Sequence, residues 1–278
     1  MNRDLVIQGS DADQSIADTL ATKVGADRAE QVGLNAFRIL NPRLTEQIPS
    51  YFDNTRIDFA LVPATRRLAE FRLVAMDMDS TLITIECIDE LADLVGRKTE
   101  VAAITAAAMR GELDYPTSLR QRVHALAGID MAAVESVYLE RLRLSPGTEA
   151  MLARLHDLRM KTLLVSGGFT YFTDRLRQRL GLDFAHSNTL EIEHDRLTGR
   201  LIGDVLDGAG KARVVIETAK RLGVAVDQII AIGDGANDLP MMAEAGVSIA
   251  YHAKPAVQKK ATYCFNHVGL DGLLHLFR

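Results

Sequence analysis

We predict an α/β protein whose core is a doubly wound parallel sheet, with an inserted helical bundle and a small N-terminal α+β unit. Three observations predict this class. From about residue 71 onward, short apolar segments typical of buried strands alternate with segments of helical periodicity. More than eighty residues separate the first two of these strands, far more than one crossover helix requires. Before them, roughly 68 residues alternate short strands and helices on their own.

The composition excludes several classes of protein. Of the 278 residues, 47% are apolar and 25% are charged, and the formal net charge is -5, as in ordinary globular proteins. No run of Lys and Arg indicates binding to nucleic acid or to an anionic membrane. No apolar run has membrane-spanning length, and no signal-peptide pattern is present. Cys87 and Cys264 lie far apart, so we expect two free thiols and a cytoplasmic protein.

The first unit, residues 1–68, carries no pattern that indicates chemistry. The expected elements are strands at residues 5–7, 32–40 and 57–62, a helix at 15–23 and a weak helix at 45–52. Asp11, Asp13 or Ser15 is available to cap the first helix. No glycine-rich loop follows a strand, and no acidic pair occurs. A regulatory module, a homodimer-forming module and a plain folding appendage all remain open.

The first strand of the core ends at two aspartates. The apolar run 71–76 stops at Asp77 and Asp79, and hydroxyls follow at Ser80 and Thr81. Ligands of open parallel sheets bind beyond the carboxyl ends of the strands. Two carboxylates in that place suggest metal chemistry on a phosphate. A calcium loop is excluded because Leu82 and Ile88 occupy the positions of its turn glycine and bidentate glutamate; a chance acidic turn remains open from this stretch alone.

A helical insertion follows immediately. Residues 86–95, 99–109, 118–127 and 132–142 have apolar spacings of three and four. An insertion at this point can close over the strand end as a lid, although a buried structural bundle is the alternative. We therefore divide the chain into an N-terminal unit (1–68), a core (69–84 and 145–278) and the insertion (85–144).

Two more strands end in polar or small residues. A helix at about 145–159 leads to a strand at 161–165, and Ser166, Gly167 and Gly168 follow, where glycines let the backbone approach an anion and a helix beginning there offers amide donors. A strand at 228–232 precedes Asp234, Asn237 and Asp238. The remaining expected elements are a hairpin at 188–202, helices at 212–222, 239 onward, 255–261 and 270–276, and strands at 247–251 and 262–265.

Lys211 lies between these strand ends, at the start of the helix 212–222. The preceding Gly208-Ala209-Gly210 superficially suggests a nucleotide P-loop, but Ala212 follows the lysine and Val205 stands where the first glycine belongs. A nucleotide P-loop is therefore excluded. The lysine can still bring one positive charge to a phosphate, although a solvated surface lysine is the ordinary alternative.

Together these motifs resemble the haloacid dehalogenase-like phosphatases, and within them the phosphoserine phosphatases. The resemblance covers roughly residues 70–278 and rests on Asp77-Met78-Asp79-Ser80-Thr81, Ser166-Gly167-Gly168-Phe169, Lys211 and Gly233-Asp234-Gly235-Ala236-Asn237-Asp238. It implies a Rossmann-like core. The first unit is a weaker match to the amino-acid-binding, ACT-like regulatory domains of some relatives, and it is short for one.

The resemblance implies a role for each motif. Magnesium is expected on Asp77, on the backbone carbonyl of Asp79 and on Asp234, with Asp238 supporting the metal from outside its ligand shell. Asp77 is expected to attack phosphorus and form an aspartyl-phosphate, and Asp79 to act as the acid and then the base. The phosphate-binding groups that the resemblance implies are Ser166, Gly167, Lys211 and Asn237.

The resemblance also places substrate choice in the insertion. It assigns Glu86 to the ammonium and Arg122 to the carboxylate of a phosphorylated amino acid, with Met109 and Tyr115 as pocket walls. Arg120 competes with Arg122, and periodicity does not choose between them. The implied activity is magnesium-dependent hydrolysis of O-phospho-L-serine, the last step of serine biosynthesis. Transfer of the phosphoryl group to another alcohol such as homoserine, and a non-catalytic amino-acid sensor, are the two rival hypotheses.

Overall fold

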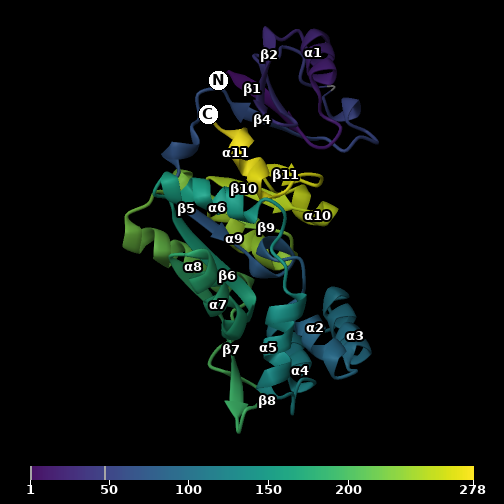
Figure 1. The fold of residues 1–278 in the computed structure, drawn as a ribbon, viewed down its shortest axis with the longest axis vertical. Helices are drawn as coiled ribbons and strands as arrows, with labels where there is room; N and C mark the ends of the chain where they lie inside the picture. Colours follow the sequence, from purple (N-terminus) through teal and green to yellow (C-terminus); the bar gives the residue numbers. More distant parts are fainter. Residues whose placement is uncertain (1, 47) are drawn as a thin grey trace.

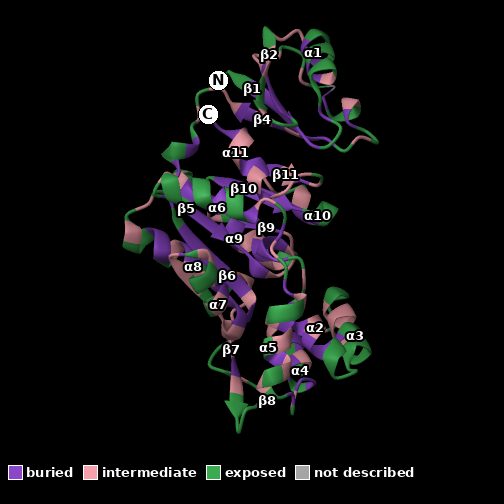
Figure 2. Cartoon of the chain, in the orientation of Figure 1, coloured by how far each residue is buried: buried purple, intermediate pink, exposed green. Residues whose placement is uncertain are grey.

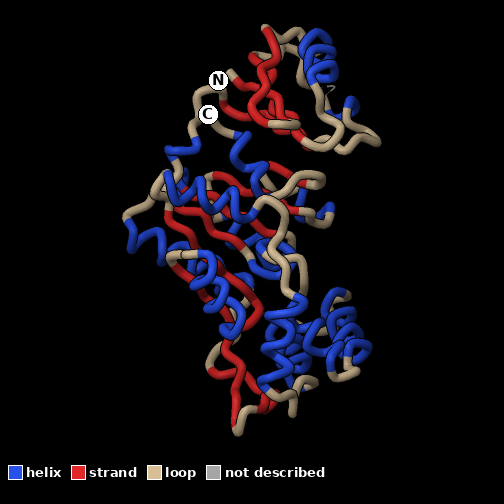
Figure 3. Tube along the Cα trace, viewed as in Figure 1, coloured by secondary structure: helices blue, strands red, loops and turns tan. Residues whose placement is uncertain are grey.

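The computed structural model describes residues 2–46 and 48–278. Figure 1 shows three regions along the longest axis of the molecule: the N-terminal sheet at the top, the large sheet with its helices in the middle, and a group of helices at the lower end. Both chain termini lie where the N-terminal sheet meets the central region. Figure 3 shows that the lowest group is helical, apart from the loops that join its helices and the tip of one strand pair beside it.

The N-terminal unit is an antiparallel sheet of four strands in the order β2-β3-β1-β4. Its elements are β1 (Arg3–Gln8), α1 (Gln14–Lys23), β2 (Arg28–Gly33), β3 (Ala36–Leu40), the 3-10 turn η1 (Pro49–Tyr51) and β4 (Asp58–Pro63). Asp13 caps α1, because its carboxylate accepts a hydrogen bond from the Ile16 backbone N–H at 2.8 Å.

Two predictions for this unit are wrong. Residues 32–40 do not form one strand, since the chain turns between β2 and β3. The helix expected at 45–52 is reduced to η1, and residue 47 within that range lies outside the described residues. The succession β-α-β-β-turn-β is that of the β-α-β-β-α-β motif with its second helix replaced by a single turn.

The core is a seven-stranded sheet in the order β11-β10-β9-β5-β6-β7-β8, which confirms the predicted α/β class. The pairs from β11 to β7 are parallel, and β8 runs antiparallel to β7. The strands are β5 (Leu73–Met76), β6 (Lys161–Phe169), β7 (Phe184–Glu193), β8 (Arg196–Ile202), β9 (Ile229–Gly233), β10 (Val247–Tyr251) and β11 (Tyr263–Phe265). Every residue of β5, β9 and β10 is buried, because helices cover both faces of the sheet.

The strand order creates a switch point beside β5. The chain passes from β5 to β6 and β7 on one side, and then returns to β9 on the other side. Crevices at such a point bind ligands in open α/β sheets. Asp77 follows β5 and Asp234 follows β9, so two of the acidic motifs lie at neighbouring strand ends.

Helices complete the core and form the insertion. Those of the core are α6 (Thr148–Asp157), α7 (Thr170–Leu180), α8 (Gly208–Leu222), α9 (Leu239–Ala243), α10 (Pro255–Gln258) and α11 (Leu273–Leu276). Those of the insertion are α2 (Cys87–Leu94), α3 (Lys98–Met109), α4 (Tyr115–His124) and α5 (Met131–Ser136), followed by a π turn, η4 (Val137–Arg141). Aspartates cap α4, α5 and α8: Asp114, Asp130 and Asp207.

The insertion is tied to the core in two places. Its two connections to the core run side by side: Thr84 N–H donates to the Arg143 carbonyl and Ser145 N–H to the Leu82 carbonyl, both at 3.0 Å. At its far end, Leu197 of β8 exchanges backbone hydrogen bonds of 2.8 Å with the loop between α4 and α5. The hairpin β7-β8 therefore extends the sheet as far as the insertion.

The hairpin turn itself has a local cause. His194 and Asp195 both adopt positive φ, of 50° and 58°. Two consecutive positive φ values give the tight turn whose twist matches that of paired strands. The predicted hairpin at 188–202 is confirmed, and β7 begins four residues earlier than expected, at Phe184.

One hydrophobic core continues from the large sheet into the N-terminal sheet. Val6, Ala60 and Val62 of the N-terminal sheet belong to the same buried cluster as Leu273 and Phe277 near the C-terminus. The other face of that sheet packs against α1 and forms its own cluster. Figure 2 shows the buried strands of both sheets in purple. The N-terminal sheet is thus packed between α1 and residues 270–278, which we call the C-terminal segment.

Candidate active site

Asp77 is held at the carboxyl end of β5. The residue is 5% exposed, and one carboxylate oxygen, Oδ1, accepts hydrogen bonds from the Met78 N–H at 2.7 Å and from Lys211 Nζ at 2.8 Å. Lys211 is 1% exposed and lies in the first turn of α8, which begins at Gly208, four residues before the predicted start at residue 212. Its ammonium also binds Asp238 Oδ1 at 2.7 Å. A buried lysine between two aspartates is therefore the centre of the site.

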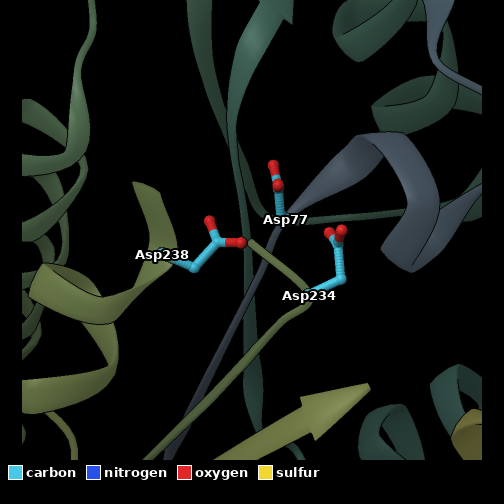
Figure 4. A group of neighbouring side chains, drawn as sticks. All are labelled: Asp77, Asp234 and Asp238. Atoms are coloured by element: carbon cyan, nitrogen blue, oxygen red, sulfur yellow. The ribbon is translucent and has the colours of Figure 1, made fainter. Parts of the chain in front are cut away.

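Three carboxylates converge around this lysine. Oxygens of Asp77, Asp234 and Asp238 lie within 4.8 Å of one another, and Figure 4 shows the three side chains pointing toward a shared space. Asp234 also accepts a hydrogen bond from Thr81 Oγ1 at 3.0 Å. Asp238 is fully buried and accepts the Gly235 N–H at 2.9 Å as well as the lysine. Among the described residues, this is the group of acidic side chains that can hold a metal ion.

The charge at this centre is not balanced by Lys211 alone. Burial, and next the negative charge of Asp238, raise the pKa of Asp77 well above its usual range, although Lys211 opposes this. Burial and then Asp238 likewise raise the pKa of Asp234 to about 6. Burial disfavours the ammonium of Lys211, but Asp238 and Asp77 outweigh it and raise the lysine pKa. A site with three carboxylates and one ammonium suits an oxygen-binding cation.

Asp79 lies in the turn after β5 and faces the insertion. Its Oδ1 accepts the N–H of Cys87, the first residue of α2, at 3.1 Å. Burial is the main cause that raises the pKa of Asp79 to about 6. The neighbouring Ser80 has φ 55°, a left-handed conformation that bends the chain sharply after the second aspartate. Asp79 can therefore hold a proton near neutral pH, which a catalytic acid requires.

The serine-glycine segment, residues 166–168, lies opposite Asp79. Gly168 has no space for a side chain, because a methyl group there would come within 2.8 Å of Asp79 Oδ2 and 2.7 Å of Met78 Cε. A methyl group on Gly167 would overlap the hydroxyl of Tyr115. The helix expected directly after Ser166 begins only at Thr170, since β6 continues to Phe169. Donors to an anion here are thus strand-end amides and not a helix N-terminus.

Glu86 and Arg122 both come from the insertion. Glu86 precedes α2, and its Oε1 accepts a hydrogen bond of 2.6 Å from Ser80 Oγ. Loss of solvation, and then the charge of Asp79, raise the pKa of Glu86 to about 7. Arg122 lies on α4, and its charge acts on both Glu86 and Tyr115. Its Nε is buried and has no hydrogen-bond partner among the described residues.

The structure separates residues that periodicity could not. Arg120 is exposed on α4, whereas Arg122 is half-buried and faces the site. Met109 is 67% exposed at the end of α3, with its sulfur 3.9 Å from Lys254 Nζ of the core. Asn237 is half-buried in the 3-10 turn Ala236–Asp238 that follows the aspartate motif.

Two side chains at the site escaped sequence reasoning. Cys87 contributes the backbone N–H to Asp79, and burial raises the pKa of its thiol well above its usual range. Asn188 is 3% exposed in β7 and binds the serine-glycine segment. No local signal marked Asn188, because its strand is largely polar and Ser187 and Thr189 lie on either side of it. Nothing local to the sequence marked Cys87.

Comparisons with known proteins agree with this site. Residues 71–246 match the family described as haloacid dehalogenase-like hydrolase. The chain is 55% identical over 217 residues to a phosphoserine phosphatase of Polaromonas sp. This match covers 76% of this chain and 92% of that relative. It is also similar to the solved structure of an unliganded probable phosphoserine phosphatase from Vibrio cholerae, with a TM-score of 0.86, 37% identity, and coverage of 99% of this chain and 86% of that one.

A third comparison matches three quarters of the chain. The structure of a phospho-aspartyl intermediate analogue of a phosphoserine phosphatase matches with a TM-score of 0.70 and 36% identity. The match covers 99% of that structure but only 75% of this chain. The resemblance inferred from the four motifs is confirmed: this chain belongs to the haloacid dehalogenase-like hydrolases.

Proposed function

We infer that the chain is a phosphoserine phosphatase, which hydrolyses O-phospho-L-serine to serine and phosphate. The observation that carries this inference is the pairing of Glu86 and Arg122 on the insertion, which faces the Asp77 centre. An ammonium beside Glu86 compensates for the burial and the Asp79 charge that raise the Glu86 pKa, and a carboxylate beside Arg122 supplies the partner that its buried Nε lacks. The phosphate then points toward Asp77.

The proposed chemistry has two steps. A carboxylate oxygen of Asp77 attacks phosphorus, the bond from phosphorus to the serine oxygen breaks, and Asp79 gives its proton to that oxygen. Water then attacks the aspartyl-phosphate, Asp79 takes back a proton, and phosphate and the free Asp77 carboxylate are released. Asp79 suits both steps because its raised pKa, about 6, lets it gain and lose a proton near neutral pH.

The acidic group supports a divalent cation as cofactor, and we propose magnesium. The surplus of carboxylates over ammonium groups, with Asp77, Asp234 and Asp238 around the single Lys211, is the observation that fits such a cation. Asp77, the backbone carbonyl of Asp79 and Asp234 would hold it, and Asp238 would keep Lys211 in place. When bound, the cation supplies positive charge for the phosphate oxygens and the attacking carboxylate.

The phosphate group needs donors on its remaining oxygens. We propose that the Ser166 hydroxyl, the Gly167 N–H, Lys211 and Asn237 supply them. Ser166 Oγ accepts the Gly168 N–H at 2.8 Å, so its own proton is free to point toward the substrate. The ammonium of Lys211 keeps its charge because two carboxylates raise its pKa.

Release of phosphate from a panel of substrates tests the function. We expect magnesium-dependent release that is fastest with phosphoserine, slower with phosphothreonine and slowest with sugar phosphates. The Asp77→Asn variant is the inactive control, and it should also lack a hydroxylamine-sensitive phosphoenzyme. Release that favours sugar phosphates over phosphoserine would contradict the proposal.

The rival hypotheses give different products. Addition of homoserine would yield a new phosphoester if the phosphoryl group passed to another alcohol, whereas a hydrolase yields only free phosphate. A non-catalytic sensor would release no phosphate from any small phosphoester. We propose catalysis over the sensor hypothesis because Asp77, Asp79, Lys211 and Asp234 lie together, and a silent site would not need this set.

We propose that the chain has three parts: the N-terminal unit (1–68), the core (69–84 and 145–278) and the insertion (85–144). We also propose that two copies of the chain form a homodimer through the N-terminal unit. The separate cluster beneath α1 supports a distinct N-terminal unit. No described helix is both long and apolar enough to cross a membrane. Free Cys87 and Cys264 support the proposal of a reducing, cytoplasmic location.

A further inference from the structure

Asn188 connects two segments that would both contact the phosphate. It lies in β7 and is 3% exposed. Its Nδ2 donates to the Gly167 carbonyl at 2.8 Å and to the Gly168 carbonyl at 3.4 Å, and its Oδ1 accepts the Leu206 N–H at 2.7 Å. Two carbonyls on one side and an N–H on the other define the orientation of this amide.

The first of these contacts fixes a peptide plane that would otherwise rotate easily. The peptide between Gly167 and Gly168 has no Cβ on either side, so its backbone is unusually free. Asn188 holds its carbonyl oxygen, and Ser166 Oγ holds its N–H at 2.8 Å. This peptide plane is therefore held at both ends. Because Ser166 Oγ accepts the Gly168 N–H, the orientation of its hydroxyl proton is restricted, and so is that of the adjacent Gly167 N–H.

The second contact reaches the helix that carries Lys211. Leu206 immediately precedes Asp207, the N-cap of α8, whose carboxylate accepts the Gly210 N–H at 2.7 Å and whose carbonyl accepts the Lys211 N–H at 2.8 Å. The start of α8 is therefore anchored to the same buried amide as the serine-glycine segment.

We propose that Asn188 is a positioning residue: its buried amide sets the distance and orientation between the serine-glycine segment and Lys211, and so shapes the phosphate site. This inference rests on the proposed phosphatase function for its kinetic test, but not for its binding test. Because only the phosphate site is involved, every phosphate ester should be affected alike, unlike a change at Arg122.

Two substitutions distinguish positioning from simple packing. Asn188→Leu keeps the size of the side chain but removes all three hydrogen bonds. Asn188→Asp keeps the acceptor for Leu206, and its second oxygen can donate to the Gly167 carbonyl only when the introduced carboxyl group is protonated. When that group ionises, two acceptors face each other and the segment is released.

The matched control is Ser187→Ala. Ser187 is the preceding residue of β7, and its hydroxyl forms a 2.7 Å hydrogen bond with Thr173 Oγ1. This variant loses a partly buried side-chain hydrogen bond in the same strand but leaves the serine-glycine segment untouched. We expect it to lower thermal stability slightly and to keep wild-type kinetics and phosphate affinity.

The measurements are kcat/KM for phosphoserine and for an aryl phosphate, and the Kd of inorganic phosphate by calorimetry with magnesium present. Asn188→Leu should lower both kcat/KM values equally, by roughly 10- to 100-fold, and weaken phosphate binding. For Asn188→Asp, the ratio of variant to wild-type values should be near one at pH 5 and fall as pH rises toward 8.

Two results would overturn the inference. One is phosphate affinity in Asn188→Leu within twofold of wild type; if that variant does not fold, the isosteric Asn188→Asp carries the test. The other is an Asn188→Asp ratio that stays constant across the pH range in which circular dichroism shows folded protein. Failure of the wild type to hydrolyse phosphoserine would refute the proposed function alone, since the Kd of inorganic phosphate still tests Asn188.

Discussion

At the scale of single residues, the site joins groups whose charges would be unfavourable alone. Asp77, Asp234 and Asp238 crowd around one buried lysine, and burial together with the charge of Asp238 raises the pKa values of Asp77 and Asp234. Such crowding costs stability in the empty site, and a phosphate with a divalent cation offsets it. The residues that would choose the substrate, Glu86 and Arg122, lie apart from this centre on the insertion.

Arg122→Ala should separate substrate choice from chemistry. Removal of one partner of a desolvated charge pair costs roughly 2–5 kcal/mol, which corresponds to about 30-fold or more in kcat/KM. We expect that loss with phosphoserine and little change with an aryl phosphate that has no carboxylate. Arg120→Ala, an exposed neighbour on the same helix, is the matched control and should behave as wild type. An equal loss on both substrates would reject Arg122 as the specificity residue.

Asp234→Asn should stabilise the metal-free protein in a pH-dependent way. The pKa of Asp234 is about 6 in the folded protein and near 3.8 when unfolded, so between these values the folded state binds more protons. Stability is therefore lost as pH rises through this window, and the loss is complete above pH 6. The Asn side chain keeps an acceptor for Thr81 and removes the titration.

The expected gain from Asp234→Asn is roughly 1–3 kcal/mol at pH 7 and about half as much at pH 5. Chemical unfolding in the presence of a chelator at both pH values measures it. Excess magnesium should reverse the order, because the wild type gains stability from the bound cation. A difference between variant and wild type that does not change with pH would contradict the assignment.

At the scale of elements, the position of the insertion depends on its two connections to the core. The second connection, residues 142–147, rests on the C-terminal segment, where Leu270 N–H donates to the Pro146 carbonyl at 2.8 Å. Gly147 then begins α6 with φ 78°. A side chain there would be strained by the positive φ and would also come within 2.5 Å of the Asp271 backbone nitrogen.

Gly147→Ala should therefore cost more stability than a glycine with the same backbone but open surroundings. Gly181, which ends α7 with φ 65°, has no atom near the position of a new methyl group and is the matched control. We expect about 1 kcal/mol for Gly181→Ala and roughly 2–4 kcal/mol for Gly147→Ala, measured by urea unfolding. Equal losses of stability in the two variants would mean that the contacts around Gly147 shift at no energetic cost, which would contradict the prediction.

At the scale of the whole molecule, the C-terminal segment unites the three regions. It supports the second connection of the insertion, and it also carries the N-terminal sheet. Arg38 of β3 donates to the carbonyls of His275 and Leu276 at 3.1 and 3.0 Å, and Gln8 Oε1 lies 3.0 Å from His275 Nδ1. The N-terminal unit is therefore packed on the segment that also positions the insertion.

A substitution at Asp58 tests how much the contact between the N-terminal unit and the core contributes to stability. The Asp58 carboxylate is buried in β4 and accepts the backbone N–H groups of Asn266, His267 and Val268 at 2.8 to 3.1 Å. Asp58→Asn turns one acceptor oxygen into a donor that faces these N–H groups, and should cost roughly 2–4 kcal/mol in urea unfolding. Asp53→Asn, an exposed aspartate of the same unit, is the control. A cost no larger than that of the control would show that the contact adds nothing to stability.

Some of the fold could be predicted because its signals are local. The buried strands β5, β9 and β10 are short apolar runs bounded by small or acidic residues, and the helices of the insertion repeat at three and four. The turn within 32–40 was missed although Gly33 and Asn35, both poor strand formers and common turn residues, mark it in the sequence between β2 and β3. The weak helix at 45–52 has too little apolar periodicity to hold more than one turn.

The amino-acid sequence by itself predicted the chemistry: Asp77, Asp79 and Asp234 follow strand ends, which a parallel sheet brings to one edge, and Lys211 lies at the start of a helix. The tertiary structure decided which side chains face that edge. It separated Arg122 from Arg120, because the packing of α4 exposes one and half-buries the other. It also brought Asn188 to Gly167, which lies 21 residues away, because that contact depends on strand register between β6 and β7 and on no local pattern.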